Sequence, residues 1–167
     1  MTKRIRQYAG LLAAVAVYYL VHEGAHLACA LLIGTFKQVN LGALGVQIDV
    51  FADQMTNLQM GIFCLVGSLA TLITSWGLSI AADAIGKCPS KLFKACMYYV
   101  TIALLLIDPL YLSVLCSLFG GGDMNGIALL TPELAARIVY SALLVINLCI
   151  LWKRVLPAYK AAFASQP

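Results

Sequence analysis

The sequence predicts an all-α membrane protein with about four transmembrane helices and a small β-hairpin or re-entrant loop after the first. The 167 residues are 62% hydrophobic and only 11% charged, which is too apolar for a soluble domain of this length. Apolar runs of about 20 residues, the length that crosses a bilayer, recur along the chain. Between the first two runs, short alternating stretches are punctuated by glycine. We therefore expect residues 1–167 to form a single integral membrane domain.

The first expected span covers residues 8–33, and Gly34 is a typical residue to end its helix. Basic residues precede it, as in a signal peptide, but the apolar run is too long for a signal core, so we keep it as a mature span. Residues 35–56 then alternate between apolar and polar. This pattern predicts a small β-hairpin, whose exposed edge could pair with an extended substrate. A plain surface loop with some strand is the alternative.

The three remaining spans are expected at residues 58–82, 95–119 and 134–152. The second span is rich in Gly, Ala and Ser, which allow close helix packing in lipid. A short polar loop, 83–94, joins it to the third span, in which Pro109 removes a backbone hydrogen bond and can kink the helix. A short polar tail follows the fourth span.

Positive charge is distributed unevenly between the two sides of a four-span arrangement. Only Lys37 and Arg137 fall on one side, whereas the other basic residues fall on the opposite side. These are Lys3, Arg4, Arg6, Lys87, Lys91, Lys94, Lys153, Arg154 and Lys160. Because basic residues stay preferentially on the cytoplasmic side, we expect a multi-pass protein of the cell membrane with both termini in the cytoplasm. The net charge of +4 therefore needs no nucleic acid to explain it.

The six cysteines are scattered along the chain and form no Cys-x-x-Cys pair. Most of them lie within apolar runs, which favours small buried hydrophobic side chains over disulfides or metal ligands. They are Cys29, Cys64, Cys88, Cys96, Cys116 and Cys149.

Residues 22–26 read His-Glu-Gly-Ala-His within the first apolar run and include both histidines of the chain. On a helix, positions i and i+4 share one face, so His22 and His26 can bind the same metal ion. Glu23 points about 100° further round the helix, within reach of a metal-bound water rather than of the ion. Ionisable groups are costly in lipid, which favours a functional site over a polar cluster that only joins helices.

This pattern is typical of zinc-dependent hydrolysis. A catalytic zinc ion takes three protein ligands and keeps a fourth position for water. The glutamate accepts a proton from that water as it attacks a carbonyl. We therefore expect one Zn²⁺ ion bound by His22 and His26, with Glu23 as the catalytic residue.

Two aspartates are candidates for the third ligand. Asp108 lies within the third span at a depth similar to that of His22, if both helices are straight. Asp123 lies in a glycine-rich loop that would sit at the outer end of the bundle, unless the loop enters it to line a cavity. A loop residue with glycine neighbours is freer to meet tetrahedral geometry. In the same loop, Asn125 could donate to a developing oxyanion or, more simply, form a turn before Gly126.

These features resemble the site-2 protease family of intramembrane zinc metalloproteases. The resemblance rests on His22-Glu23-Gly24-Ala25-His26 in a first span, a glycine-containing hairpin after it and a glycine-flanked aspartate after a later span. Only the first of these motifs is specific. The resemblance implies that Asp123 is the third zinc ligand, with Asp108 as the alternate or a supporting partner. Typical members have an Asp-Gly pair with an Asn-Pro lead-in, whereas Asp123-Met124 here indicates a compact, divergent member.

The expected function is therefore a zinc-dependent intramembrane endopeptidase that cleaves a transmembrane or membrane-inserted protein substrate within the lipid bilayer. One alternative is a non-catalytic membrane protein that binds or transports a divalent metal. Glu23 beside the first histidine favours hydrolysis, because transport has no need for that spacing. A further alternative is an inactive scaffold.

Overall fold

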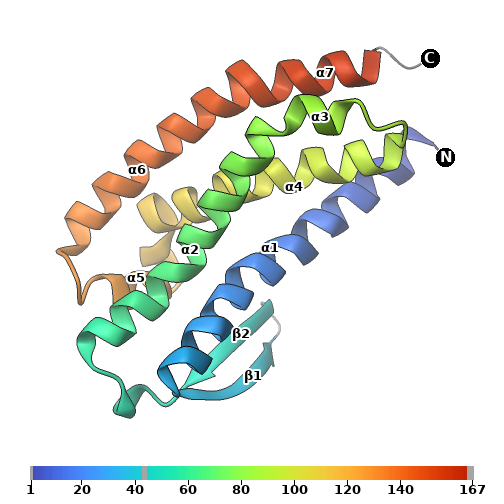
Figure 1. Ribbon diagram of the computed structural model, residues 1–167. Helices are drawn as coiled ribbons and strands as arrows, with labels where there is room; N and C mark the ends of the chain where they lie inside the picture. The colour runs from blue at the N-terminus through green and yellow to red at the C-terminus, as the bar shows by residue number, and fades with distance from the viewer. Residues whose placement is uncertain (1, 43–44, 165–167) are drawn as a thin grey trace.

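A computed structural model describes residues 2–42 and 45–164 and confirms the predicted fold class (Figure 1). In this part of the chain, four helical segments are long and apolar enough to cross a membrane. They are α1 (Lys3–Ile33), α2 (Asn57–Ile80), α4 (Lys91–Leu110) with its continuation to Leu118, and α6 (Glu133–Ile150) with its continuation to Ala164.

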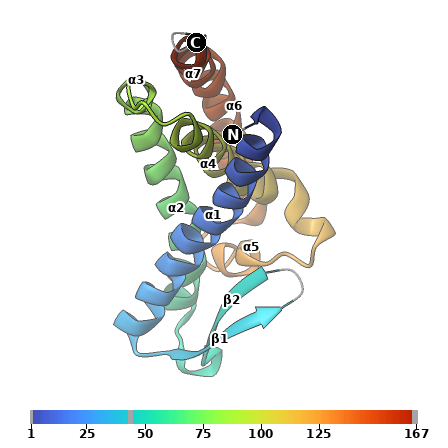
Figure 2. The same cartoon turned by 90° about the vertical axis from the view of Figure 1, so that its right-hand side faces the viewer.

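The segment after the first helix is a β-hairpin, as predicted. Strand β1 (Phe36–Gly42) pairs antiparallel with β2 (Gly45–Val50), and Gly42 is opposite Gly45. The hairpin follows directly from the end of α1, because Gly34 takes a left-handed conformation, with φ of 82°, that reverses the chain. Figures 1 and 2 both show the hairpin beside the C-terminal half of α1.

The prediction of a polar loop at residues 83–94 is partly wrong. A short helix, α3 (Ala82–Gly86), occupies its first part, and α4 begins at Lys91 within its second part. The hydroxyl of Ser90 accepts a hydrogen bond from the Phe93 backbone N–H and so begins α4 earlier than the apolar pattern suggested. In the same way, the Thr2 side chain caps α1, which starts at Lys3 rather than at residue 8.

The last helix continues beyond residue 152, the predicted end of the span, through residues expected to form a polar tail. A π-turn, η4 (Leu151–Val155), leads directly into α7 (Leu156–Ala164). The helix continues because Val155 and Tyr159 are buried against Ala82 of α3 and Leu105 of α4. Because Val155 and Tyr159 supply the buried apolar face of this helix, its other positions can be polar.

The third span contains a proline whose missing hydrogen bond is replaced from another helix. Pro109 has no backbone N–H, so the Leu105 carbonyl one turn earlier lacks its usual donor. The fully buried Asn147 of α6 donates its Nδ2–H to that carbonyl at 2.7 Å. Its Oδ1 accepts from the Trp76 indole of α2 at 2.9 Å. Asn147 thus joins three spans and satisfies a backbone group that lipid cannot.

Beyond the proline, the third span ends in a π-turn, η2 (Tyr111–Leu115), and a 3₁₀ turn, η3 (Cys116–Leu118).

Different elements lie at the two ends of the bundle. Both termini, α3 and α7 lie at one end, whereas the hairpin and the short helix α5 (Asp123–Ile127) lie toward the other (Figure 1). Between them, α1 packs closely on α4 near Gly10, where an added Cβ would lie 2.4 Å from the Tyr99 ring. This close contact holds α1, the helix that carries both histidines, against the bundle.

Replacing Asn147 with leucine is expected to lower the free energy of unfolding by about 1–2 kcal/mol, because the Leu105 carbonyl and the Trp76 N–H lose their partner. In a Pro109→Ala background the same change should cost less, because alanine supplies the missing backbone N–H. Thermal unfolding of the purified protein in detergent measures both effects. Asn40→Ala, at an exposed position of β1, is the control. Equal losses in the two backgrounds would contradict the compensation.

Candidate metal centre

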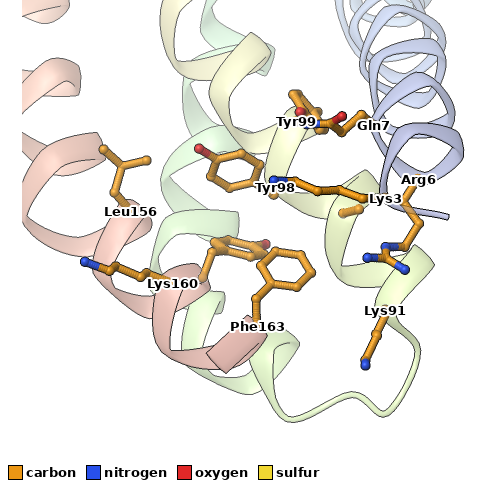
Figure 3. Close-up of a pocket in the computed structure, with 11 residues that line it drawn as sticks. Lys3, Arg6, Gln7, Lys91, Tyr98, Tyr99, Leu156, Lys160 and Phe163 are labelled. Atoms are coloured by element: carbon orange, nitrogen blue, oxygen red, sulfur yellow. The ribbon is translucent and has the colours of Figure 1, made fainter. Parts of the chain in front are cut away.

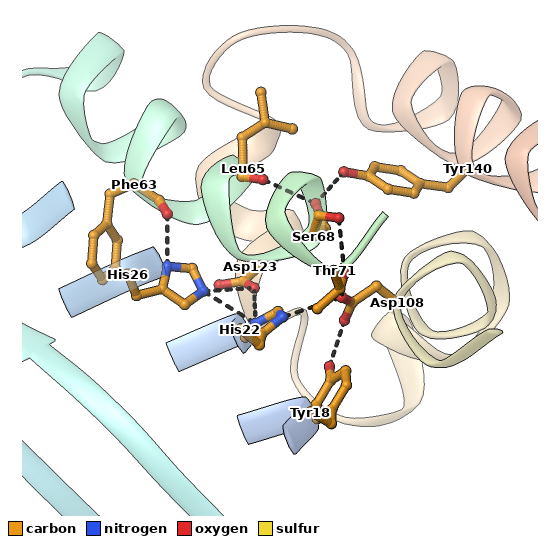
Figure 4. Close-up of polar contacts among 10 residues, drawn as sticks. All are labelled: Tyr18, His22, His26, Phe63, Leu65, Ser68, Thr71, Asp108, Asp123 and Tyr140. Atoms are coloured by element: carbon orange, nitrogen blue, oxygen red, sulfur yellow. Dashed lines mark hydrogen bonds and ion pairs between the residues drawn. The ribbon is translucent and has the colours of Figure 1, made fainter. Parts of the chain in front are cut away.

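Both histidines lie on the buried face of α1, one turn apart. His22 is 8% exposed and His26 is 3% exposed. Their Nε2 atoms lie 3.1 Å from each other, so both rings direct the same nitrogen toward one point (Figure 4). The helical spacing predicted this convergence.

Asp123 reaches the histidines because the glycine-rich segment folds back into the bundle. Gly120, Gly121 and Gly122 all have positive φ angles, which residues with a Cβ rarely adopt. Helix α5 then packs closely on α2, since a Cβ at Gly126 would lie 2.3 Å from the Cys64 sulfur. As a result, Asp123 Oδ2 lies 3.2 Å from His22 Nε2 and 3.4 Å from His26 Nε2.

The two Nε2 atoms and Asp123 Oδ2 form a triangle slightly smaller than that of a tetrahedral zinc site. Zinc–nitrogen and zinc–oxygen distances of about 2.0–2.2 Å place neighbouring ligand atoms about 3.3–3.6 Å apart. The triangle formed by the two Nε2 atoms and Asp123 Oδ2 has edges of 3.1, 3.2 and 3.4 Å. His22, His26 and Asp123 are also the group of described residues whose ligand atoms lie close enough to hold an ion.

The outer nitrogens of both rings are held by acceptors. His22 Nδ1 lies 3.2 Å from Asp108 Oδ2, and His26 Nδ1 lies 2.7 Å from the Phe63 carbonyl. Since a carboxylate and a carbonyl only accept, each Nδ1 carries the proton and donates it. In the neutral rings both Nε2 lone pairs then face each other and Asp123. Such a cluster of acceptors is stable only around a positive charge, either protons or a metal cation.

Asp108 orients the His22 ring and lies outside the triangle. Besides His22 Nδ1–H, it accepts hydrogen bonds from the Tyr18 hydroxyl and from the Thr71 hydroxyl. It is 2% exposed, so these donors from two other positions satisfy a buried carboxylate. Asp108 and His22 lie at a similar depth, as the sequence predicted, and their side chains are in contact. Asp108 contacts Nδ1 of the ring, whereas Nε2 belongs to the triangle, so Asp108 has the position of a supporting partner.

Gly67 of α2 has no side chain, and this leaves open space beside the triangle. A Cβ at this position would lie 2.4 Å from His26 Nε2 and 2.8 Å from His22 Nε2. Any side chain there would fill the volume toward which the two lone pairs point. The small residues of this span, Gly67 among them, predict only close helix packing from the sequence. The role of Gly67 depends on a distance between two helices, which no pattern within α2 could indicate.

The charge of Asp123 fits a cation site. This residue lies outside the four candidate spans. Burial raises the pKa of its carboxyl, but hydrogen bonds and positive charge from the two protonated imidazoles lower it by a larger amount. The net effect is a fall in the pKa from 3.8 to about 2. The lowered pKa keeps the Asp123 carboxyl charged at neutral pH, which is the form that can bind a metal cation.

Glu23 is half-buried and faces the hairpin. It lines a groove of about 460 Å³ between α1 and the two strands, together with Leu20, Val39 and Ile48. Ile48 of β2 lies across this groove from the helix that carries Glu23. Glu23 is therefore the neighbour of His22 in sequence and lines the groove between α1 and the hairpin.

Asn125 is used within its own loop. Its Nδ2 donates to the Gly120 carbonyl at 3.0 Å, and its side chain is exposed. This contact corresponds to the turn-forming alternative. The six cysteines are all free, and none of them belongs to the triangle.

Comparison with family models, with curated proteins and with solved structures gives no match to this chain.

The sequence did not indicate the groups that orient the ligands. Tyr18, Thr71 and the Phe63 carbonyl come from helices whose relative placement was unknown. Tyr18 is the exception in principle, because it precedes His22 by four residues and therefore shares its helix face.

Substituting Gly67 with alanine is expected to prevent metal binding while leaving the helical content intact, because the added Cβ occupies the centre. The measurement is zinc per chain by elemental analysis of the purified protein, with circular dichroism as the check on folding. Gly77→Ala is the matched control, since a Cβ at Gly77 on the same helix meets nothing within 4 Å. Full zinc loading in Gly67→Ala would contradict this assignment of the centre.

The two aspartates are expected to differ in their effect on metal affinity. Asp123→Ala removes a ligand and should abolish stoichiometric zinc binding. Asp108→Asn leaves the ligands in place but weakens the orientation of His22, so affinity should fall by about 10–100-fold. Zinc titration against a competing chelator separates the two results. The reverse order of severity would identify Asp108 as the ligand.

Proposed function

We propose that this protein is a zinc-dependent intramembrane endopeptidase, as the resemblance to the site-2 protease family implies. One observation carries the proposal: two Nε2 atoms and one carboxylate oxygen converge within 3.1–3.4 Å of each other beside a glutamate in the order His-Glu-x-x-His. The orientation of both imidazoles by Nδ1 hydrogen bonds supports metal binding over a purely structural cluster.

In the proposed mechanism, His22, His26 and Asp123 would hold a zinc ion. When bound, it would supply the Lewis acidity that makes water nucleophilic near neutral pH. Glu23 accepts the proton as water attacks the peptide carbonyl and then delivers it to the leaving amine. Asp108 keeps the His22 ring in the tautomer and orientation that ligation requires. The role of Glu23 is supported by its position next to His22 in sequence and beside the hairpin groove.

The proposed substrate is a transmembrane or membrane-inserted segment of another protein. The apolar groove beside Glu23, lined by Leu27, Val39 and Ile48, favours an apolar polypeptide over a polar one. A peptide bond within an intact helix is shielded, so segments weakened by glycine or proline should be cut most readily. The adjacent strands could hold such an extended segment by backbone hydrogen bonds.

Glu23→Gln is expected to keep one zinc ion per chain and to lose cleavage by about 10²–10⁴-fold, because the amide cannot accept the proton. The assay uses the protein in lipid vesicles with synthetic transmembrane peptides that contain a Gly-Pro step, and products are detected by mass spectrometry. Glu133→Gln, the same substitution at an exposed position of α6, is the control. Metal transport into vesicles that is unchanged in Glu23→Gln, without peptide cleavage by the wild type, would instead support the transport function.

We further propose that the protein lies in the cell membrane with both termini in the cytoplasm. The support is the charge asymmetry, since most basic residues belong to the end that holds both termini. A fluorescent protein that matures only in the cytoplasm should be bright when fused to the C-terminus and dark when fused after Thr131. The opposite pattern would reverse the orientation.

A further inference from the structure

A second cavity lies at the other end of the molecule from the hairpin. It has a volume of about 730 Å³ and is formed by the N-terminal turn of α1, the first half of α4 and the C-terminal helix α7 (Figure 3). These elements are the ends of three of the candidate membrane spans. If the helices cross a bilayer, the cavity lies at the level of the lipid headgroups.

The rim of this cavity is basic. Lys3 and Arg6 come from α1, Lys91 from α4 and Lys160 from α7. No acidic side chain among the described residues lines the cavity. Cations from three separate helices therefore surround one opening, which creates a local positive potential that favours an anion.

The walls of the cavity are apolar and aromatic. Tyr98 and Tyr99 project from α4, and Phe163 faces them from α7 (Figure 3). Ala95, Leu156 and Tyr159 add to these walls, and Gln7 of α1 is a polar residue of the lining. Tyrosine is typical of the membrane–water interface, where its ring contacts acyl chains and its hydroxyl contacts headgroups. A basic rim over apolar walls matches a molecule that has an anionic head and an apolar tail.

The α7 wall is fixed in place by a buried lysine. Lys94 is fully buried, and its ammonium group donates to the Ala162 carbonyl at 2.8 Å. It also lies 5.6 Å from the centre of the Phe163 ring. This contact ties the end of α7 to α4 and places a further positive charge beside the cavity.

We propose that this cavity binds an anionic phospholipid, with its phosphate at the basic rim and its acyl chains along the aromatic walls. Arginine and lysine together suit a phosphate, because the guanidinium can bind two oxygens and the ammonium groups supply charge. The apolar walls select a lipid over free phosphate, which has nothing to place against them. The bound lipid bridges α1 and α7, and so holds the helix that carries the histidines at its cytoplasmic end.

The test uses the full-length protein in nanodiscs of phosphatidylcholine with or without phosphatidylglycerol. Native mass spectrometry of the released protein should show one retained phosphatidylglycerol, and the melting temperature should be higher with phosphatidylglycerol than without it. In Lys3→Gln/Arg6→Gln, retention should fall about tenfold or more, because two charges near the phosphate are removed. Lys87→Gln/Lys153→Gln is the matched control, since it removes the same charge at the same end, outside the cavity.

Three results would overturn the proposal. The control variant would lose as much lipid as the cavity variant if only net charge mattered. Phosphatidylcholine would be retained as well as phosphatidylglycerol if the cavity did not select an anion. If the site bound a free anion rather than a lipid, inorganic phosphate in neutral detergent would raise the melting temperature as much as the lipid does. Circular dichroism establishes that both variants are folded. None of these measurements depends on peptide cleavage or zinc.

Discussion

The candidate centre depends on the way in which both imidazoles are held from behind. Because Asp108 and the Phe63 carbonyl accept from the two Nδ1–H groups, the Nε2 lone pairs of His22 and His26 must face inward. Turning either ring would leave a buried acceptor without its donor, at a cost of about 1–3 kcal/mol. The inward arrangement leaves three acceptor atoms close together, and a positive charge between them resolves their repulsion.

This arrangement requires contributions from four separate parts of the chain. Helix α1 supplies the rings, α2 supplies the Phe63 carbonyl and the open space at Gly67, α4 supplies Asp108, and α5 supplies Asp123. The close packing of α5 on α2 at Gly126 is therefore as important for the centre as the ligands themselves. It brings a loop residue to the depth of residues that lie within a span.

Polar groups elsewhere in the bundle follow the same rule that lipid imposes, namely that each buried donor or acceptor finds a partner within the protein. The hydroxyls of Ser68, Ser75 and Ser79 donate to backbone carbonyls of α2 itself. Asn147 replaces the hydrogen bond that Pro109 removes. Polar residues in these spans thus serve two purposes. Most satisfy backbone or side-chain groups of the helices, and one cluster converges on the three atoms that could hold a metal ion.

The sequence alone determined the number of spans, the hairpin and the pairing of His22 with His26, because each follows from apolar length, from alternation or from the pitch of a single helix. It could not decide between Asp108 and Asp123, since their depths depend on whether the glycine-rich segment enters the bundle. It also ended the last helix too early, because the buried face of Val155 and Tyr159 exists only where α7 meets its neighbours. The roles of Gly67 and Asp108 were decided by tertiary structure for the same reason: a local pattern carries no information about distances between helices.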